Sequence, residues 1–213
     1  MNTNISTTPN KVLMQNARES LRGKWGISIG GLCIAIIVFL IGSIIPFANL
    51  ILAAPISVGL IYFYLKIARN EYPKIDQIFS ALKGNRILST IVAGILSQIF
   101  IMLGLICLII PGIILSIAFQ LVYYILADNP EINGFDAIKK SYHLMNGNKW
   151  KYVCLSCRFI GWYLLALCTL GIGFLWLIPY FIVSIGNFYR DIIQDNHQSN
   201  IQEPKSFSDI SNV

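Results

Sequence analysis

The sequence predicts an all-α, polytopic membrane protein with about six transmembrane helices, arranged as three helical hairpins that each follow a short amphipathic interfacial helix. Of its 213 residues, 55% are hydrophobic and 12% are charged, whereas soluble domains carry about 25% charged residues. Three stretches of about 40 residues (25–65, 87–127 and 152–189) contain a single charged residue, Arg158. A chain with so few charges has too little polar surface to cover a water-soluble fold.

The length of each stretch predicts a hairpin. A continuous helix of 40 residues would be about 60 Å long, which is about twice the hydrocarbon thickness of a bilayer. Turn-forming residues lie near the middle of each stretch, at Pro46–Asn49, Pro111–Gly112 and Gly171–Gly173. The six predicted spans are 25–45, 49–67, 87–109, 112–127, 152–169 and 172–189. The fourth span is short, so a tilted or partly re-entrant second hairpin is an open alternative.

A short amphipathic segment precedes each hairpin. Leu13, Ala17 and Leu21 recur at steps of four residues, and apolar residues also recur at helical spacings over 75–82 and 135–145. Such a stripe predicts a helix with one apolar face. A helix of this kind lies flat in the membrane interface, with its apolar face toward the lipid.

A glycine ends each amphipathic segment, at Gly23, Gly84 and Gly147. Glycine adopts the left-handed conformation that ends a helix, and the bases and tryptophans that follow prefer the headgroup level. The nearly even spacing of the glycines predicts three copies of one unit, over 11–70, 73–128 and 133–190. The alternative is that any protein with several membrane hairpins places bases and glycines at these points.

Basic residues predict the orientation. The three hairpin tips contain no Lys or Arg, and these residues are retained on the cytoplasmic side. We therefore expect a multi-pass membrane protein with both termini in the cytoplasm. The polar composition of residues 1–10 predicts a disordered N-terminus, and that of residues 191–213 predicts a flexible tail. Residues 11–190 between them are predicted to form one membrane domain.

Charge also predicts the partners. The net charge of +6 favours contact with anionic lipid headgroups. Nucleic acid is not expected as a partner, because the bases surround the membrane segments and do not form one basic domain.

The residues that could carry chemistry are few. Cys154 and Cys157 share one helical face, but no second cysteine pair accompanies them, so small apolar filling is favoured over a metal site. No Asp or Glu lies in any predicted span, which argues against ion-coupled transport, although not against a pore. We expect no catalytic activity, no cofactor and no metal.

Other residues predict helix packing. Glycine lets helices approach closely in lipid, and Gln98 and Gln120, in opposite arms of the second hairpin, predict an interhelical hydrogen bond of about 0.6 to 2 kcal/mol. A substrate gate at the glycines and a polar path at the glutamines are the less favoured alternatives. The residues assigned to packing and capping are Gly23, Gly84, Gly147, Gly161, Trp162, Gly171, Gly173, Pro179 and Tyr180.

Arg158 is the one charge inside an apolar stretch. It lies seven residues beyond Lys151, about 10 Å below the membrane surface by helical rise. Its long side chain can reach back to the headgroups, and we favour this interpretation, in which Arg158 has no specific binding role. The functional hypothesis is an anion or lipid-headgroup site formed by Arg158 with Lys149 and Lys151.

Two stretches also carry a resemblance, "AIKKSYHLMNGNKWKY" at 137–152 and "RFIGWYLLALCTLGIGFLWLIPYFIVSIGNFYRDI" at 158–192. They resemble a family of small bacterial integral membrane proteins catalogued as domain of unknown function 975, and the likeness covers roughly residues 12–191. Asn146 stands where Lys or Arg is usual in that family, and Arg158 where Ser is usual. The resemblance implies a multi-span bacterial membrane protein and brings no assigned activity. The residues that match the family pattern are Ser141, Met145, Gly147, Phe159, Ile160, Gly161, Trp162, Gly171, Ile172, Gly173, Pro179, Tyr180, Phe188 and Tyr189.

Two functions of different class follow. The first is a non-catalytic membrane protein that binds lipid or a partner and affects envelope properties. The alternative is a transporter or channel for a small or amphipathic solute, which would need polar residues facing inward from all three hairpins.

Overall fold

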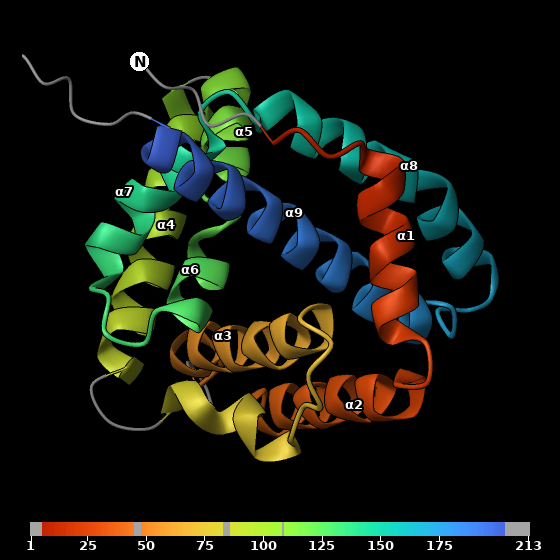
Figure 1. The fold of residues 1–213 in the computed structure, drawn as a ribbon. Coiled ribbons are helices and arrows are strands. Elements are labelled where there is room, and N and C mark those ends of the chain that lie inside the picture. The colour runs from red at the N-terminus through yellow and green to blue at the C-terminus, as the bar shows by residue number, and fades with distance from the viewer. Residues whose placement is uncertain (1–5, 45–47, 83–85, 108, 203–213) are drawn as a thin grey trace, which may run out of the picture.

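The computed structural model describes residues 6–44, 48–82, 86–107 and 109–202. These residues form helices without any strand, so the all-helical prediction is confirmed (Figure 1). In chain order the helices are α1 (Asn10–Leu21), α2 (Trp25–Gly42), α3 (Ala48–Ala68), η1 (Ile75–Leu82), α4 (Arg86–Cys107), α5 (Ile109–Ala118), α6 (Val122–Asp128), α7 (Gly134–Met145), α8 (Lys149–Cys168) and α9 (Phe174–Gln202).

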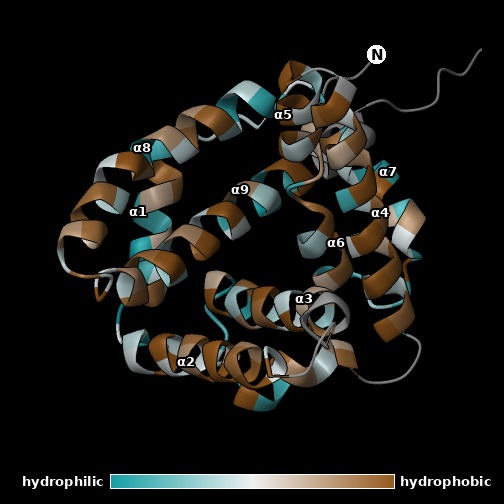
Figure 2. Ribbon diagram, turned by 180° about the vertical axis from the view of Figure 1, so that it is seen from behind, coloured by the Kyte–Doolittle hydropathy of each residue, from teal (hydrophilic) through white to brown (hydrophobic). Residues whose placement is uncertain are grey.

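Four helical segments among the described residues are long and apolar enough to cross a membrane: Trp25–Gly42, Arg86–Ile106, Ile109–Asp128 and Lys149–Cys168. Leu52–Ala68, within α3, is a shorter apolar helix. Large apolar side chains on these helices, such as Leu40, Met102 and Leu167, are more than 60% exposed. Brown, apolar residues accordingly run along the outer helices in Figure 2. Water-soluble proteins rarely expose apolar surface on this scale, so the four helices fit a membrane location.

The fourth predicted span, 112–127, is broken. Helix α5 ends at Ala118 and α6 begins at Val122, with a turn between them. The Ser141 hydroxyl of α7 donates a hydrogen bond of 2.7 Å to the carbonyl oxygen of Ala118, in a buried position. A helix can break within an apolar environment only where the freed backbone groups find such partners.

For description we divide the helices into three units, α1 to α3, η1 to α6 and α7 to α9, and call the last helix of each unit its returning helix. The returning helices α3, α6 and α9 lie in the middle, with α2, α4 and α8 outside them (Figure 1). Each short helix packs on the returning helix of the preceding unit: η1 on α3 and α7 on α6. Helix α1 packs on α9, the returning helix of the last unit, so the three units close on one another.

Aromatic residues occupy the centre of the molecule. Five aromatic residues of α3, α6 and α9 are at most 3% exposed: Phe63, Tyr64, Tyr124, Phe188 and Tyr189. The hydroxyls of the tyrosines donate hydrogen bonds, among them one of 2.8 Å from Tyr64 to a carbonyl on α2 and one of 3.0 Å from Tyr124 to a carbonyl on α9. A buried tyrosine contributes apolar area and needs such a partner for its hydroxyl, so these bonds hold neighbouring helices together.

The apolar face of α1 is covered by protein. Leu13, Ala17 and Leu21 are at most 2% exposed, because α1 packs against α9 and α3. The sequence predicted that this face would lie against lipid. Helical periodicity shows that a helix has one apolar side, but it does not show what covers that side.

Two of the predicted glycine caps are type II turns. Gly23 has φ +77° and Gly147 has φ +88°, and the residues before them have extended dihedrals, with φ −61° and ψ 125° at Arg22. The turns close through backbone hydrogen bonds of 2.9 Å, from Lys24 to Leu21, and 3.1 Å, from Asn148 to Met145. A type II turn requires positive φ at its third residue, which favours glycine. The third predicted cap, Gly84, lies outside the described residues.

The N-terminal segment from Ser6 to Asn10 is held in place, although its composition predicts disorder. The Ser6 amide donates to the Asn148 side chain at 2.7 Å, and Lys151 donates to the Ser6 carbonyl at 2.7 Å. The Ser6 and Thr8 hydroxyls both donate to the carboxylate of Asp191 on α9. We call residues 6–10 the strap. At the other end of the chain, α9 continues through Gln202, beyond the predicted start of the flexible tail at 191.

Candidate functional site

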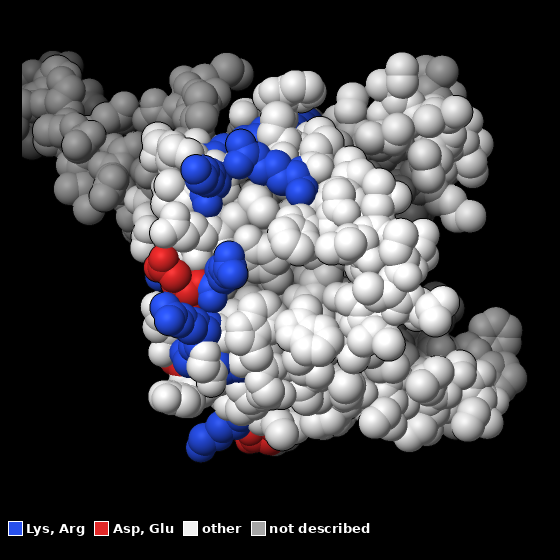
Figure 3. Space-filling view, turned by 90° about the vertical axis from the view of Figure 1, so that its right-hand side faces the viewer, with Lys and Arg blue, Asp and Glu red and all other residues white. Residues whose placement is uncertain are grey.

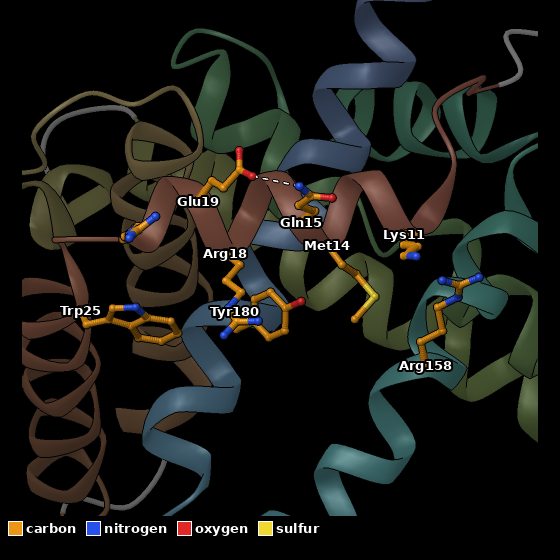
Figure 4. A pocket seen from close by; sticks show the side chains of 9 residues that line it. Lys11, Met14, Gln15, Arg18, Glu19, Trp25, Arg158 and Tyr180 are labelled. Carbon is orange, nitrogen blue, oxygen red and sulfur yellow. Dashed lines mark hydrogen bonds between the residues drawn. The ribbon is translucent and has the colours of Figure 1, made fainter.

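A groove lies between α1, α8 and α9. Its larger part, which we call the polar mouth, has a volume of about 1020 Å³. Figure 4 shows α1 crossing above the mouth, with Tyr180 below it and Arg158 facing it from the neighbouring helix. The lining residues are Lys11, Met14, Gln15, Arg18, Glu19, Arg22, Trp25, Arg158 and Tyr180.

The groove continues into a second, apolar part of about 330 Å³, which we call the apolar arm. Arg18, Trp25 and Tyr180 line both parts, so mouth and arm are adjacent and share a wall. The remaining residues of the arm come from the C-terminal half of α8, the beginning of α9 and the turn between them: Trp162, Leu165, Ala166, Thr169, Gly173, Trp176 and Leu177.

Helical periodicity explains why α1 presents its bases to the mouth. Lys11, Gln15, Arg18 and Arg22 lie at steps of three or four residues, so they share one face of the helix. Leu13, Ala17 and the other buried residues occupy the opposite face and hold α1 on α9. Burial of one side of α1 therefore orients the basic side toward the groove.

The mouth is electropositive. Its charged residues are four bases and one acid, Glu19, which accepts a hydrogen bond of 3.0 Å from Gln15. The ion pairs within the described part of the chain are Lys66–Glu71, Arg69–Asp128 and Lys151–Asp191, and none of them involves a base of the mouth. Concave surfaces lined by charges of one sign concentrate ions of the opposite sign, so the mouth attracts anions.

The structure separates the three predicted anion-binding residues. Arg158 lines the mouth. Lys149 lies over the ring of Tyr142, with 5.3 Å between its ammonium nitrogen and the ring centroid. Lys151 pairs with Asp191 at 3.5 Å and holds the strap. Lys149 and Lys151 therefore lie outside the groove.

Sequence reasoning missed the bases that join Arg158. Lys11, Arg18 and Arg22 come from a helix more than 130 residues away in the chain. Their spacing on one face of α1 was a usable signal. What it could not show was the helix that this face would meet.

The residues assigned to packing have several roles. A Cβ added to Gly173 would lie 2.7 Å from the Ala166 Cα, so this glycine permits the close approach of α8 and α9 near their connection. Gly171 has φ +88° in the turn between them. Trp162 and Tyr180 line the groove, and Pro179 is buried within α9.

Gly161 does not serve helix packing. No atom lies within 4 Å of a Cβ built on it. Gly161 is itself exposed, so no neighbouring helix packs on it.

Gln98 and Gln120 do not form the predicted interhelical pair. Both are exposed, and no hydrogen bond joins them in the described structure. Gln120 lies in the turn that separates α5 from α6, which changes its direction relative to α4. The prediction used residue number to estimate how deep each glutamine lies in the membrane. It did not consider which side of its helix each glutamine side chain occupies.

No cysteine whose side chain the structure describes lines either part of the groove. Cys33, Cys154, Cys157 and Cys168 are free thiols. The described residues contain no group of three or more His, Cys, Asp or Glu side chains that could hold a metal ion. What the groove offers is a basic mouth beside an apolar, tryptophan-lined arm.

Fold and groove together define a class: an all-helical protein with membrane-type apolar helices and a basic groove on one side. Residues 100–196 match the model of a family described as "Protein of unknown function (DUF975)", which confirms the resemblance predicted from the sequence. The matched segment includes α8 and the apolar part of α9, whereas α1 precedes it. The comparisons with curated proteins and with solved structures found no match.

Proposed function

We propose that this protein is a non-catalytic, multi-pass protein of the bacterial inner membrane that binds anionic lipid in the groove and thereby affects envelope properties. One observation carries the proposal: the basic mouth and the apolar arm are adjacent and share Arg18, Trp25 and Tyr180. An anionic lipid has the same two parts, a charged headgroup beside hydrocarbon.

The chemistry of the lining supports a phosphate-bearing headgroup. Guanidinium groups form charge-assisted, often bidentate hydrogen bonds with phosphate, and Arg18 and Arg158 approach the mouth from different helices (Figure 4). Three tryptophans line the arm: Trp25, Trp162 and Trp176. Tryptophan combines a large apolar ring with one polar group and is favoured where hydrocarbon meets headgroups.

The distribution of charge supports a cytoplasmic orientation of the mouth. Figure 3 shows Lys and Arg side chains gathered along one edge of the molecule, while the remainder of that face is uncharged. The positive-inside rule places such an edge in the cytoplasm. In this arrangement each of the three units forms a hairpin, the returning helices cross the membrane, and both termini lie in the cytoplasm.

Topology reporters test the orientation. Reporters fused after Arg69, after Asn133 and at the C-terminus should give a cytoplasmic signal, because the basic edge is retained there. Reporters inserted near positions 49 and 171 should give an external signal. An external signal after Asn133 would contradict the arrangement of three hairpins.

Substitution of Arg158 tests the binding site. We expect Arg158→Leu to weaken the binding of phosphatidylglycerol about tenfold, since a hydrogen bond to a charged group contributes roughly 1.5 to 3 kcal/mol. Insertion and the stability of the lipid-free protein should be unchanged, because Arg158 is exposed and takes part in no ion pair of the described structure. Thermal stability in nanodiscs with increasing phosphatidylglycerol measures both quantities.

Lys149→Leu is the matched control, since it removes a base from the same helix but outside the groove. It should bind phosphatidylglycerol like the parent. If anionic lipid stabilises the Arg158 variant as much as the parent, the groove is not the binding site.

A transporter or channel remains the alternative, but the groove supports it less. Transport would need a polar path between the returning helices α3, α6 and α9. Both parts of the groove lie instead between α1, α8 and α9.

A further inference from the structure

We infer that the groove selects an amphiphile with one hydrocarbon chain and a bulky, phosphate-bearing headgroup over an ordinary two-chain phospholipid. This inference rests on the proposed function, since it specifies the class of anionic lipid that the groove takes. Its basis is the difference in size and lining between the mouth and the arm.

The arm has room for little more than one chain. Its volume of about 330 Å³ lies at the lower end of the range of roughly 300 to 1,000 Å³ for pockets that hold drug-sized ligands. The mouth, with about 1020 Å³, is three times larger. A ligand that fills both has a headgroup that is large compared with the hydrocarbon that enters the protein.

Buried residues form one wall of the arm. Ala166 and Leu177 are at most 5% exposed there, and the close contact of Ala166 with Gly173 joins α8 to α9. From Trp162 to Thr169, the segment of α8 and its C-cap that lines the arm, the helical rise gives a length of about 10 Å, or about one third of the hydrocarbon thickness of a bilayer. The arm therefore matches part of a single hydrocarbon chain.

The mouth selects charge. Lys11, Arg18, Arg22 and Arg158 outnumber Glu19, and Arg158 comes from a different helix than Lys11 and Arg18 (Figure 4). A phosphate between them receives hydrogen bonds from two helices at once. A zwitterionic headgroup would place a cation among these bases.

Tryptophan fluorescence gives a direct measurement. Three of the four tryptophans line the arm, and the fourth, Trp150, lies outside it and is 77% exposed. In a Trp150→Phe protein in phosphatidylcholine nanodiscs, lysophosphatidylglycerol with a brominated chain should quench the fluorescence. It should bind at least tenfold more tightly than brominated lysophosphatidylcholine or two-chain phosphatidylglycerol, and inorganic phosphate should neither quench nor stabilise.

The length of the lipid chain distinguishes binding in the arm from nonspecific partitioning into the bilayer. Burial of one methylene contributes about 0.8 kcal/mol, so affinity should rise about fourfold for each added methylene and then level off when the arm is full. Partitioning into the bilayer would continue to rise without levelling off. An unbroken rise would overturn the inference.

A pair of substitutions locates the chain. Leu165 lines the arm, whereas Leu164, its neighbour on α8, does not. Both are more than half exposed, so tryptophan can be accommodated at either position without disturbing the core. Leu165→Trp should weaken binding of lysophosphatidylglycerol about tenfold and Leu164→Trp should not; equal effects would contradict a chain in the arm.

The outcomes also separate the inference from the proposed function. If two-chain phosphatidylglycerol binds as tightly as the single-chain lipid and its binding depends on Arg158, the proposed function stands and the selectivity fails. If no anionic lipid binds in preference to its zwitterionic counterpart, both fail.

Discussion

Gly59→Ala should destabilise the protein by about 3 kcal/mol, at the upper end of what overpacking usually costs. A Cβ added to Gly59 on α3 would lie 2.6 Å from the carbonyl carbon of Ile78 and closer still to its oxygen. Both atoms belong to the backbone of η1, so no rotamer change can relieve the clash. Ile78 is fully buried, and the whole of η1 would have to move away from α3.

Unfolding in detergent, followed by circular dichroism against temperature or denaturant, measures this effect. Gly161→Ala in α8 is the control, because an added Cβ there meets no atom within 4 Å. Alanine in the interior of a helix is favoured over glycine by roughly 0.5 to 1 kcal/mol, so this variant should be as stable as the parent or slightly more stable. Equal losses for the two variants would show that α3 and η1 do not pack as described.

Asp191→Asn should cost about 2 kcal/mol and release the strap. The Asp191 carboxylate accepts hydrogen bonds from Ser6 and Thr8 and lies 3.5 Å from the Lys151 ammonium. The Lys151 and Asp191 side chains are 19% and 13% exposed. Loss of one partner of a fully buried pair costs about 3 to 5 kcal/mol, and the remaining contact with solvent reduces the effect here.

The same carboxylate predicts acid sensitivity. Burial acts to raise the pKa of Asp191, but the hydrogen bonds from Ser6 and Thr8 and the charge of Lys151 outweigh it and lower the pKa below its usual value. Because the pKa is lower in the folded state, the contribution to stability is fully present above about pH 4. It is lost as the pH falls through the folded-state pKa.

Hydrogen exchange of the strap, residues 6–10, between pH 7 and pH 3 measures its release. Glu131→Gln is the control, since Glu131 is exposed and forms no ion pair in the described structure. Asp191→Asn should expose the strap at neutral pH, and the parent and the control should expose it only in acid. Protection of the strap in Asp191→Asn at pH 7 would contradict its anchoring role.

The limits of the long apolar helices α2, α4 and α8 could be predicted from the sequence to within a few residues, whereas the break between α5 and α6 and the length of α9 could not. Helix α2 begins at Trp25 and α8 ends at Cys168, close to the predicted limits at 25 and 169. Hydrophobicity along the chain is sufficient for this, because each apolar helix satisfies its own backbone hydrogen bonds and depends little on its neighbours. The turns at Gly23 and Gly147 were recognisable for a similar local reason, since positive φ favours glycine.

The site could be predicted only in part. Arg158 stood out because a charge in an apolar stretch is costly. Its companions on α1, the pairing of Lys151 with Asp191 and the exposure of Gly161 all depend on which helices become neighbours.

The sequence by itself determined the all-helical class, the limits of the long apolar helices α2, α4 and α8 to within a few residues, the turns at Gly23 and Gly147 and the segregation of bases from the predicted hairpin tips. Each of these features depends on residues close together in the chain. The tertiary structure decided which face of each helix is covered, and therefore that the bases of α1 meet Arg158 over a tryptophan-lined arm. The physical reason is that the rise along a helix follows directly from residue number. Rotation about the helix axis relative to a distant helix is decided instead by how the side chains of the two pack together.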